Sequence, residues 1–504
     1  MKRNNFLTIL VLLIAGFVVV SCNTTTQEPQ LTLANMTKDL PSEGGTLALS
    51  FTCNGAWSVD TTGFKWLKLS QVSGAAGDAT INLTATANSA GISRSVLLNI
   101  ISENGQSRRV TAHQAPIIFP SYNTSPVAPN ATGMGSTAAQ IAANIKLGIN
   151  IGNTMEAPGG ETGWGNPVIT QQLIDGYKKA GFTAIRIPCR WDGTYYHSTE
   201  KKWHYNEATH LINTKTEQID PAWIARVKEV VQYCMNDGLY AYVEIHEGWL
   251  DCNATGARLD TIKAKQKALW EQIATEFRDY DEHLMFGSAN EPYGYPEPFS
   301  FTLPTVTNLY DFHQIFINAV RSTGGKNAYR TLIVQAPITS GDLADYYQPN
   351  GVPGLPVDNM PNRLMMEFHN YGPYPFCLDS DPTTAFFYWG KNYHSTTDLT
   401  HNATWGEESS VDPVFVRLKA EFVDKGIPMV MGEYGAFPPN GSLTGDNLTL
   451  SKASRGHWYS YVTHVALKSG ALPFVWDTGE ILDRTTGAVK NQQVLDSLRY
   501  AASY

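Results

Sequence analysis

Cysteine is scarce in this sequence. Its 504 residues contain six cysteines, which stand far apart with no paired spacing. This excludes a disulfide-stapled scaffold and the common zinc-binding cysteine motifs. We expect five of the six to be mostly buried free thiols, with one disulfide bridge as the alternative in an oxidising compartment. These five are Cys53, Cys189, Cys234, Cys252 and Cys377.

The sequence also lacks an excess of positive charge. It has 37 Lys and Arg residues against 46 Asp and Glu residues, a formal net charge of −9. This argues against a nucleic-acid partner, because binding phosphates needs a basic surface. The sequence contains no phosphate-binding loop, complete dinucleotide motif or Gly-x-Ser-x-Gly elbow. His246-Glu247 begins a zinc-protease motif, but Leu250 stands where the second His is needed. We expect neither a metal nor a cofactor.

An apolar run at the N-terminus, from Phe6 to Val20, follows the basic pair Lys2-Arg3. It is short for a bilayer span and ends on Ser21-Cys22, which resembles the bacterial lipobox. We therefore predict a lipoprotein signal peptide over residues 1–21, a lipid anchor on Cys22 and a polar tether over residues 22–30. A plain signal peptide with an incidental cysteine is the alternative.

Residues 31–117 have the pattern of an all-β sandwich, with short alternating segments between turn-forming residues. The expected strands are 45–52, 56–59, 66–69, 79–85, 94–101 and 108–113. The region resembles the BACON module, an immunoglobulin-like domain of Bacteroidetes proteins, in Gly44-Gly45, Trp57, Trp66-Leu67, Ser73-Gly74, Asn88, Arg94 and Gln114. Such a module could bind carbohydrate. Trp57 and Trp66 at alternating positions favour core packing, and hence a spacer.

Proline becomes frequent in the next segment, residues 118–134, which contains Pro120, Pro126 and Pro129 among Ser, Asn and Thr. Proline restricts φ and removes a hydrogen-bond donor, so we predict a semi-rigid linker. Removing residues 23–134 is then expected to leave the function of the following domain largely unchanged.

Residues 135–504 alternate between short runs rich in Ile, Val and Leu and longer helical patterns. The eight apolar runs are 146–152, 183–188, 240–246, 284–290, 332–337, 364–370, 428–433 and 472–476. The helical patterns include 170–180, 221–236, 261–280, 309–322, 412–425 and 452–468. Continuous apolar strands are typical of a parallel sheet that is buried on both faces. Eight such units predict an α/β fold, the (β/α)8 TIM barrel, with long loops.

Polar or aromatic residues stand at nearly every strand end, and these ends share one face of such a barrel. Glu291 follows the fourth run and Glu433 ends the seventh, so their carboxyls would face each other. Carboxyls about 5 Å apart make a retaining glycosidase, and a gap of about 6.5–9.5 Å makes an inverting one. Either glutamate considered singly could equally be a helix cap or a surface charge. Their joint placement predicts catalysis.

These motifs together resemble glycoside hydrolase family 5 across residues 135–504. The matching segments are Arg186-Ile187-Pro188, His246, Asn290-Glu291-Pro292, His369-x-Tyr371, Gly432-Glu433-Tyr434-Gly435 and Trp476. Residues 148–157 and 161–167 are similar to the opening segments of the family's fourth subfamily. The resemblance implies that Glu291 is the general acid/base and Glu433 the nucleophile.

The resemblance also implies a set of substrate-binding residues around the two glutamates. Asn290 would bond the 2-hydroxyl of the sugar at the cleavage subsite, and Trp476 would form the floor beneath that sugar. His246 and His369 would orient the sugar and the carboxylates. Two side chains would contact the nucleophile and keep it ionised, Arg186 and Tyr371. Three further residues of the strand-end loops are expected to bind substrate: Asn153, Trp164 and Trp249.

Two glutamates on the third strand depart from the family pattern. Related sequences usually have a neutral residue where Glu244 stands, and a His or an aromatic residue where Glu247 stands. Glu244 shares a strand face with His246 because side chains alternate with a period of two. We expect Glu244 to pair with Arg186 or His246, or to titrate with the site.

Aromatic residues are abundant in the strand-end loops. Of twelve tryptophans, seven fall there: Trp164, Trp191, Trp203, Trp249, Trp389, Trp405 and Trp476. Exposed rings suit the apolar faces of sugars, although core packing is the alternative for any one of them. Loops 189–220 and 371–411 would then wall the open cleft of an endo-acting enzyme.

We therefore expect a retaining glycoside hydrolase that cleaves internal β-1,4-glucosidic bonds of plant cell-wall β-glucans. The Bacteroidetes-like domain order favours xyloglucan, with mixed-linkage glucan, cellulose, xylan or mannan as alternatives. A non-catalytic surface glycan-binding lipoprotein is the alternative from another class, although it would need neither glutamate. We expect a monomer that is lipid-anchored to the outer membrane or cell surface of a Gram-negative bacterium.

Overall fold

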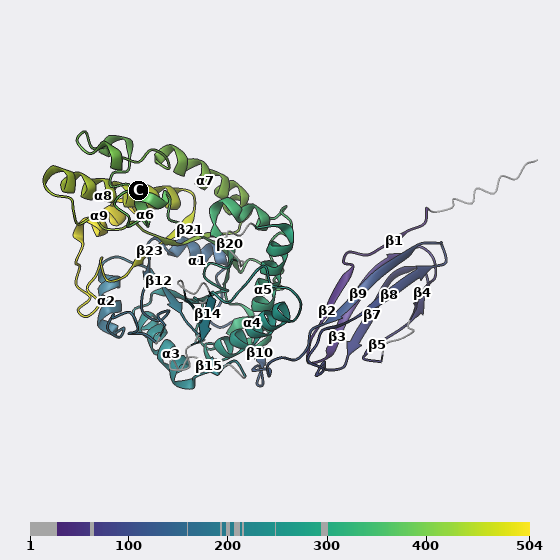
Figure 1. The fold of residues 1–504 in the computed structure, drawn as a ribbon. Coiled ribbons are helices and arrows are strands. Elements are labelled where there is room, and N and C mark those ends of the chain that lie inside the picture. The colour runs from purple at the N-terminus through teal and green to yellow at the C-terminus, as the bar shows by residue number, and fades with distance from the viewer. Residues whose placement is uncertain are drawn as a thin grey trace, which may run out of the picture. The chain divides into compact units, whose positions relative to one another are not determined.

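The structure of the chain is a computed structural model that describes residues 28–60, 65–158, 160–191, 194–197, 202–205, 212–213, 216–246, 248–293 and 301–503. The predicted signal peptide, Cys22 and Glu247 lie outside these ranges. The chain divides into two compact units, Met1–Pro116 and Ile117–Tyr504 (Figure 1). Among the described residues, no helix is long and apolar enough to cross a membrane.

The first unit is a sandwich of two sheets, with strand orders β1-β3-β7-β5 and β2-β9-β8-β4-β6. Its strands are β1 (Leu31–Thr32), β2 (Thr37–Leu40), β3 (Gly45–Cys53), β4 (Trp57–Asp60), β5 (Leu67–Leu69), β6 (Ser73–Gly74), β7 (Gly77–Ala85), β8 (Arg94–Ser102) and β9 (Ser107–Gln114). Alternate residues of both sheets meet in one apolar core, for example Leu49 and Phe51 from one sheet and Leu98 and Ile100 from the other. The predicted sandwich is therefore confirmed.

Neither tryptophan of the expected BACON motif offers an open ring face. Trp57 is 3% exposed and packs edge-on against Phe51, with ring centroids 5.0 Å apart. The guanidinium of Arg94 lies over the ring of Trp66, 4.5 Å from its centroid. Both placements favour core packing over a sugar-binding platform.

The proline-containing segment 118–134 is packed against the barrel rather than standing between the units. The buried carboxylate of Glu271 accepts hydrogen bonds from Ser121 Oγ and from the backbone N–H of Tyr122 and Asn123. The short strand β10 (Val127–Pro129) pairs with β19 (Gly324–Gly325). These contacts correct the prediction of a linker, because prolines that remove donors still leave carbonyls and neighbouring N–H groups free to dock.

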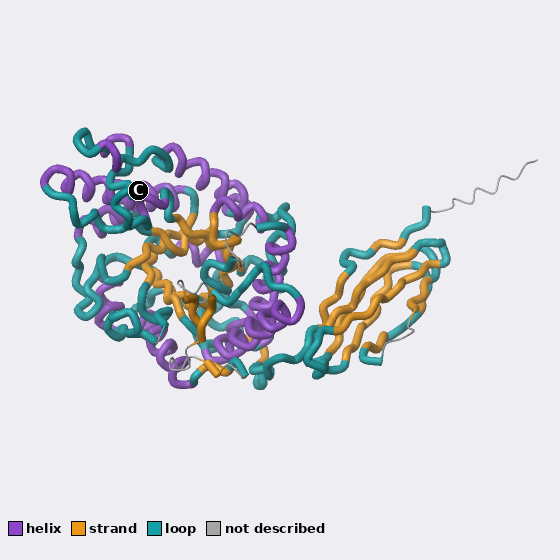
Figure 2. Tube along the Cα trace, in the orientation of Figure 1, coloured by secondary structure: helices purple, strands orange, loops and turns teal. Residues whose placement is uncertain are grey.

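The second unit is a closed barrel of eight parallel strands, in the order β11-β12-β17-β18-β20-β21-β22-β23. Their bounds are β11 (Gly148–Ile151), β12 (Ala184–Cys189), β17 (Tyr240–Ile245), β18 (Leu284–Gly287), β20 (Leu332–Ser340), β21 (Leu364–Asn370), β22 (Met429–Tyr434) and β23 (Ala471–Asp477). All eight predicted runs contain these strands or overlap them, which confirms the TIM barrel. Figure 2 shows the ring of strands inside a ring of helices.

The helices around the barrel are α2 (Gln171–Lys179), α3 (Pro221–Asn236), α4 (Gly256–Glu276), α5 (Leu303–Ser322), α7 (Glu408–Glu421), α8 (Gly445–Lys468) and α9 (Gln492–Ala501), with α1 (Ala138–Asn144) and α6 (Tyr374–Cys377) as shorter pieces. Short 3-10 turns are η2 (Lys326–Ala328), η3 (Gly341–Tyr347), η4 (Lys391–Tyr393), η5 (Leu399–His401) and η6 (Val423–Lys425). The remaining strands lie in or beside the loops, namely β13 (Thr194–His197), β14 (Lys202–Tyr205), β15 (Ile212–Asn213) and β16 (Gln218–Ile219).

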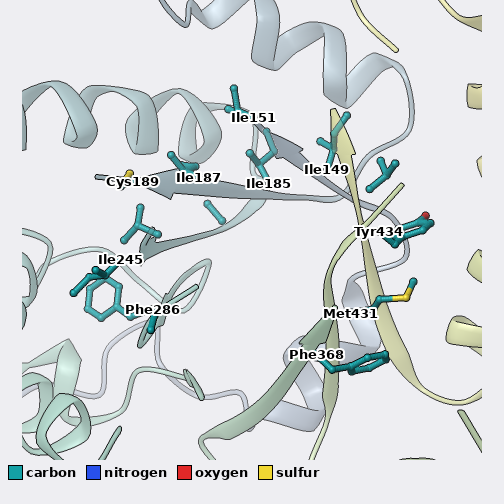
Figure 3. Packing of buried hydrophobic residues seen from close by; sticks show 14 of the residues in the cluster. Ile149, Ile151, Ile185, Ile187, Cys189, Ile245, Phe286, Phe368, Met431 and Tyr434 are labelled. Carbon is teal, nitrogen blue, oxygen red and sulfur yellow. The ribbon is translucent and has the colours of Figure 1, made fainter. Parts of the chain in front are cut away.

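Side chains alternate along the barrel strands, so outward-facing and inward-facing residues form two separate apolar cores. Outward residues such as Ile149, Ile185 and Ile187 pack in the layer between strands and helices (Figure 3). Inward residues from the lower part of the barrel form a separate cluster with α1, which includes Ala184, Tyr242, Met285, Ile333, Met365, Val430, Leu472 and Phe474. Above this apolar layer the inward positions become polar, so the barrel supports a charged mouth. The five described cysteines are buried and free, as predicted.

Candidate active site

Glu433 reaches the barrel mouth because β22 breaks its alternation. Gly432 is left out of the strand pairing, since Met431 and Glu433 oppose consecutive residues of β21. Such a bulge re-aims the next side chain, and Tyr434 after it returns to the outer core. A Cβ on Gly432 would lie 1.8 Å from Glu367 Oε1, so a side chain at this bulge cannot be accommodated without displacing that carboxylate.

Glu291 stands in the loop directly after β18 and approaches Glu433 across the mouth. His369 lies between them, because its Nδ1 donates to Glu291 Oε1 at 2.8 Å and is 3.7 Å from Glu433 Oε2. One oxygen of each carboxylate and a ring nitrogen of His369 all lie within 4.8 Å of one another. The Glu291 side chain is 41% exposed and that of Glu433 is 7% exposed. One carboxylate is therefore open to the cleft and the other is enclosed.

Arg186 holds the enclosed carboxylate. This buried guanidinium on β12 donates from Nη1 to Glu433 Oε1 at 2.6 Å and from Nη2 to Asn290 Oδ1 at 2.7 Å. The Tyr371 hydroxyl donates to Glu433 Oε2 at 3.0 Å. Burial by itself raises the pKa of Glu433, but the cations His369 and Arg186 outweigh it and hold the pKa at about 2. The carboxylate therefore stays ionised near neutral pH.

The charge on His369 is set by the carboxylates around it. Burial by itself lowers the pKa of His369, but Glu433, Glu291 and Glu367 outweigh burial and raise the pKa to about 10. Its Nε2 donates to Glu367 Oε1 at 3.3 Å. With both ring nitrogens protonated and engaged, the imidazolium is fixed between the two carboxylates of the mouth.

Glu367 is a part of the site that sequence analysis did not single out. It is buried in β21, where it accepts hydrogen bonds from Gln335 Nε2 at 2.6 Å and the Tyr242 hydroxyl at 3.1 Å. Arg186 Nε lies 3.4 Å from its Oε1. Burial raises the pKa of Glu367, but Arg186 outweighs it and the pKa falls below its ordinary value. Its position two residues before His369, on the same strand face, was the signal that could have revealed it.

His246 and Trp476 form a stacked pair at the ends of β17 and β23, with ring centroids 5.9 Å apart and planes 25° from parallel. His246 Nδ1 donates to Glu244 Oε1 at 2.7 Å. The same oxygen of Glu244 lies 3.4 Å from Arg186 Nη2. Both contacts expected for Glu244 are therefore present.

This geometry pairs an ionised carboxylate with an exposed one, beside the stacked rings of His246 and Trp476. A glycosidase uses such a pair of carboxyl groups. A family profile described as "Cellulase (glycosyl hydrolase family 5)" matches residues 149–480, which include both glutamates. The chain belongs to glycosyl hydrolase family 5. A second profile, "Viral BACON domain", matches residues 21–116.

Two relatives of this family 5 enzyme cover more than four fifths of the chain, and a third covers less than three quarters of it. The xyloglucan-specific endo-beta-1,4-glucanase BoGH5A of Bacteroides ovatus is 32% identical over 453 residues, which cover 86% of this chain and 84% of that protein. A solved Bacteroides ovatus GH5 xyloglucanase in complex with a XXXG heptasaccharide has 28% identity and a TM-score of 0.66, covering 94% of this chain and 100% of that one. A GH5-4 broad specificity endoglucanase from Bacteroides salanitronis has 31% identity and a TM-score of 0.61, with coverage of 73% and 96%.

Asn153 and Trp164 belong to the loop after β11, which this family 5 enzyme holds through a buried glutamate. Glu156 accepts hydrogen bonds from the backbone N–H groups of Asn153 and, at 3.0 Å, Thr154. Asn153 has a left-handed φ of 59°, and its carbonyl accepts a hydrogen bond from Asn166 Nδ2 at 2.8 Å. Trp164 is 54% exposed on this loop, as a sugar-binding ring needs to be. Sequence analysis did not single out Glu156.

The position of Trp249 corrects the expectation that it binds substrate. Its side chain belongs to the main core and is 8% exposed. Lys265 Nζ lies 4.8 Å from the centroid of its ring, so the ring is used for a cation–π contact. Trp191 and Trp389 are also fully buried. The tryptophans of the strand-end loops thus include buried core residues as well as exposed ones. The side chain of Trp203 lies outside the described residues.

A cavity of about 360 Å³ opens next to His369, between β20, β21 and α7. His369, which bonds Glu291, forms part of its wall, and so do Asn370 and Trp405. Trp405 is 56% exposed and comes from the long loop after β21. This loop therefore supplies one wall of a cavity next to His369, and the expectation that it walls a substrate cleft stays a prediction.

The trio Glu291, His369 and Glu433 also has the composition of a cation site. Two observations favour acid/base chemistry instead. The guanidinium of Arg186 already neutralises Glu433, and the raised pKa of His369 leaves this ring without a free lone pair. A protonated ring next to a guanidinium repels a metal ion.

Proposed function

We propose that this family 5 enzyme is a retaining endo-β-1,4-glucanase in which Glu433 is the nucleophile and Glu291 the general acid/base. The observation that carries the proposal is the separation of the two carboxylates, with oxygens within 4.8 Å. Retaining enzymes hold their carboxyls about 5–5.5 Å apart, whereas inverting enzymes need about 6.5–9.5 Å to admit a water.

The environments of the two glutamates support their separate roles. Glu433 is enclosed, and Arg186 and Tyr371 direct its oxygens. An ionised, oriented carboxylate can attack the anomeric carbon, and the glycosidic bond then breaks as a covalent glycosyl-enzyme forms. Glu291 is exposed to the cleft, where it would protonate the departing oxygen. It would next remove a proton from the water that attacks the anomeric carbon and releases Glu433.

The polymer specificity is proposed from the cleft and the relatives together. Exposed Trp164 and Trp405 come from two different loops, after β11 and β21, which suits a chain longer than one sugar. Relatives named as xyloglucan-specific and as broad-specificity endoglucanases support a β-1,4-linked glucan. We propose xyloglucan as the preferred substrate, with mixed-linkage glucan, cellulose, xylan and mannan as alternatives.

A glycan-binding protein without catalysis is the second class of function. It would not require a carboxylate pair at this separation or an arginine bonded to one of the two. The buried Arg186–Glu433 contact at 2.6 Å therefore favours the enzyme. We also propose that the chain acts as a monomer on a lipid anchor at Cys22, at the outer membrane or cell surface of a Gram-negative bacterium.

The proposal is tested by reducing-end release from xyloglucan, mixed-linkage β-glucan, carboxymethyl cellulose, glucomannan and xylan. Early release of short oligosaccharides from one β-glucan is expected, with loss of at least about 10³-fold in Glu433→Ala because the nucleophile is missing. NMR of the first product should show the β-anomer, as retention requires. An α-anomer would overturn the retaining mechanism.

Two further results would revise the assignment. A Glu433→Ala variant with near-native turnover and an unchanged melting temperature would remove Glu433 as nucleophile. A folded wild-type protein that binds glucan but releases no reducing ends from any of the five polymers would favour the glycan-binding function.

A further inference from the structure

Glu244 is the least expected charge in the site, and it is fully buried. It lies on β17 between Tyr242 and His246, and all three side chains point into the barrel by the strand's period of two. Gly287 on the neighbouring strand makes room for it, since a Cβ there would lie 3.0 Å from Glu244 Cβ. A buried carboxylate is costly unless it is paired, so its partners identify its purpose.

The main partner of Glu244 is His246. Glu244 Oε1 accepts from His246 Nδ1 at 2.7 Å, which requires the proton to be on Nδ1. This contact fixes the ring where it stacks on Trp476. Within the described part of the chain, Nε2 of His246 has no hydrogen-bond partner, and the side chain is 17% exposed. The free nitrogen is therefore available to a ligand in the mouth.

The buried carboxylates of the mouth outnumber Arg186 and His369, which favours a charged His246. Arg186 contacts three enclosed carboxylates, Glu244, Glu367 and Glu433, at 3.4, 3.4 and 2.6 Å. Arg186 and the protonated His369 supply two positive charges, and a protonated His246 supplies a third. The buried Glu156 nearby adds a fourth carboxylate to the same mouth.

The groups facing His246 act in the same direction. They are Glu244 on its own strand, Glu433 on β22 and Glu156 in the loop after β11, while Arg186 on β12 reaches it only through Glu244. Burial by itself lowers the pKa of His246, but the three carboxylates, Glu244 foremost, raise it above its ordinary value.

We propose that Glu244 is a positioning residue that keeps His246 doubly protonated and parallel to Trp476, so that Nε2–H is a fixed donor to a hydroxyl of the sugar at the cleavage subsite. The inference rests on the proposed glycosidase function. It names a device that a neutral side chain at this position could not provide, because a neutral side chain can orient the ring without holding its charge. Glu244 itself need not touch the substrate.

The first test does not depend on turnover. NMR of isotope-labelled histidine side chains follows the titration of His246 in the wild type and in Glu244→Gln. The glutamine keeps an oxygen that accepts from Nδ1 but carries no charge. We expect His246 to be protonated at pH 7 in the wild type and to titrate at lower pH in the variant. A wild-type His246 that is neutral at pH 7 would overturn the proposal, whether or not the variant folds.

The second test separates positioning from folding. Glu244→Gln should lose about ten- to hundredfold in kcat/KM on the best glucan, because a charged hydrogen bond to the sugar is weakened. The alkaline limb of its pH profile should move to lower pH. Glu244→Asp keeps the charge and should keep that limb in place, with a smaller loss. A matched control is Glu271→Gln, which changes a buried carboxylate outside the mouth and should leave the pH profile unchanged.

The outcomes also separate this inference from the proposed function. A wild type that releases no reducing ends from any glucan would refute the function, while the NMR titration would still judge Glu244. An active wild type whose Glu244→Gln variant keeps both kcat/KM and the alkaline limb would refute the inference and leave the glycosidase intact.

Discussion

At the scale of single residues, the site is organised around one buried guanidinium. Arg186 meets three carboxylates, and each of them has a second cationic or donor partner. This arrangement explains how a glutamate as enclosed as Glu433 can remain ionised, since the loss of hydration is replaced by fixed charges and donors. Truncating Arg186 would leave three buried carboxylates without this shared cation, so the substitution would damage folding as well as catalysis.

The pH dependence of stability should reveal the protonated His369. Its pKa is raised from an ordinary 6.5 to about 10 in the folded chain. The stabilisation it provides is therefore fully present below about pH 6.5 and is lost progressively as the pH rises to about 10. The melting temperature of the wild type should exceed that of His369→Gln by about 5 °C or more at pH 6, and the difference should shrink towards pH 10.

A histidine substitution away from the mouth controls for this result. His313 lies on α5, where its Nδ1 meets Ser288 Oγ at 2.8 Å and its Nε2 meets the Gln335 carbonyl at 3.0 Å. Burial lowers the pKa of His313 to about 4. This ring is therefore neutral between pH 6 and pH 10, and His313→Gln should not reproduce the trend. A constant difference between wild type and His369→Gln across this range would show that His369 is not held as a cation.

At the scale of elements, the decisive features are a bulge and a docked segment. The bulge at Gly432 lets one strand present Glu433 inward and Tyr434 outward. The segment before the barrel closes on helices α4 and α5, through Glu271 and through hydrogen bonds from Asn123 to Ser322. Both features lie where local sequence patterns predicted something simpler, a regular strand and a semi-rigid linker.

Two truncated chains should show whether segment 117–134 stabilises the barrel. A chain that starts at Ile117 should keep both its activity on soluble glucan and its melting temperature. A chain that starts at Gly135 loses the three donors that the segment supplies to the Glu271 carboxylate, and a hydrogen bond to a charged group contributes about 1.5–3 kcal/mol. We expect its melting temperature to fall by about 5 °C or more, measured by circular dichroism.

Glu271→Gln in the chain that starts at Ile117 serves as the matched variant, because it weakens the same contacts without removing residues. It should lower the melting temperature by part of that amount. Equal melting temperatures for the two truncations would mean that segment 117–134 contributes nothing to the barrel.

At the scale of the whole molecule, the chain couples a catalytic barrel to a module that shows no open sugar platform on Trp57 or Trp66. A spacer is useful to an enzyme that is tied to a membrane and acts on a bulky polymer. The proposed anchor can be tested by cell fractionation. Cys22→Ala should move the protein from the membrane fraction to the soluble one, because one residue carries the acyl chains. Labelling with a palmitate analogue should be lost in parallel.

The anchor proposal would fail if Cys22→Ala stayed in the membrane fraction and the wild type took up no label. If the wild type instead has a plain signal peptide, it should take up no label and should be found in the soluble fraction. The wild type and Cys22→Ala should have the same activity on soluble glucan, since the barrel contains the complete carboxylate pair.

The sequence by itself determined the parts of this protein that depend on local periodicity. The alternating segments predicted the sandwich and the eight apolar runs predicted the barrel strands, because each pattern indicates which face of a strand is buried. Barrel closure then brings strand ends to one mouth, so Glu291 and Glu433 could be paired from their places in the order of strands. The order of strands also placed Arg186, His246, His369 and Tyr371 at the mouth, while the roles expected of them came from the family resemblance.

Only the tertiary structure decided which side chains those residues meet. Glu367 is a buried carboxylate whose partners Gln335, Tyr242 and Arg186 come from three other strands. Its strand face could be read from the local pattern, but these partners could not. Trp249 and Trp164 both lie in loops that follow barrel strands, and the sequence suggested the same role for both. In the structure Lys265 of α4 lies over the ring of Trp249, which is buried, whereas the ring of Trp164 is exposed. Partners separated by a hundred residues or more are set by how the barrel closes, and a local period of two or 3.6 carries no information about that closure.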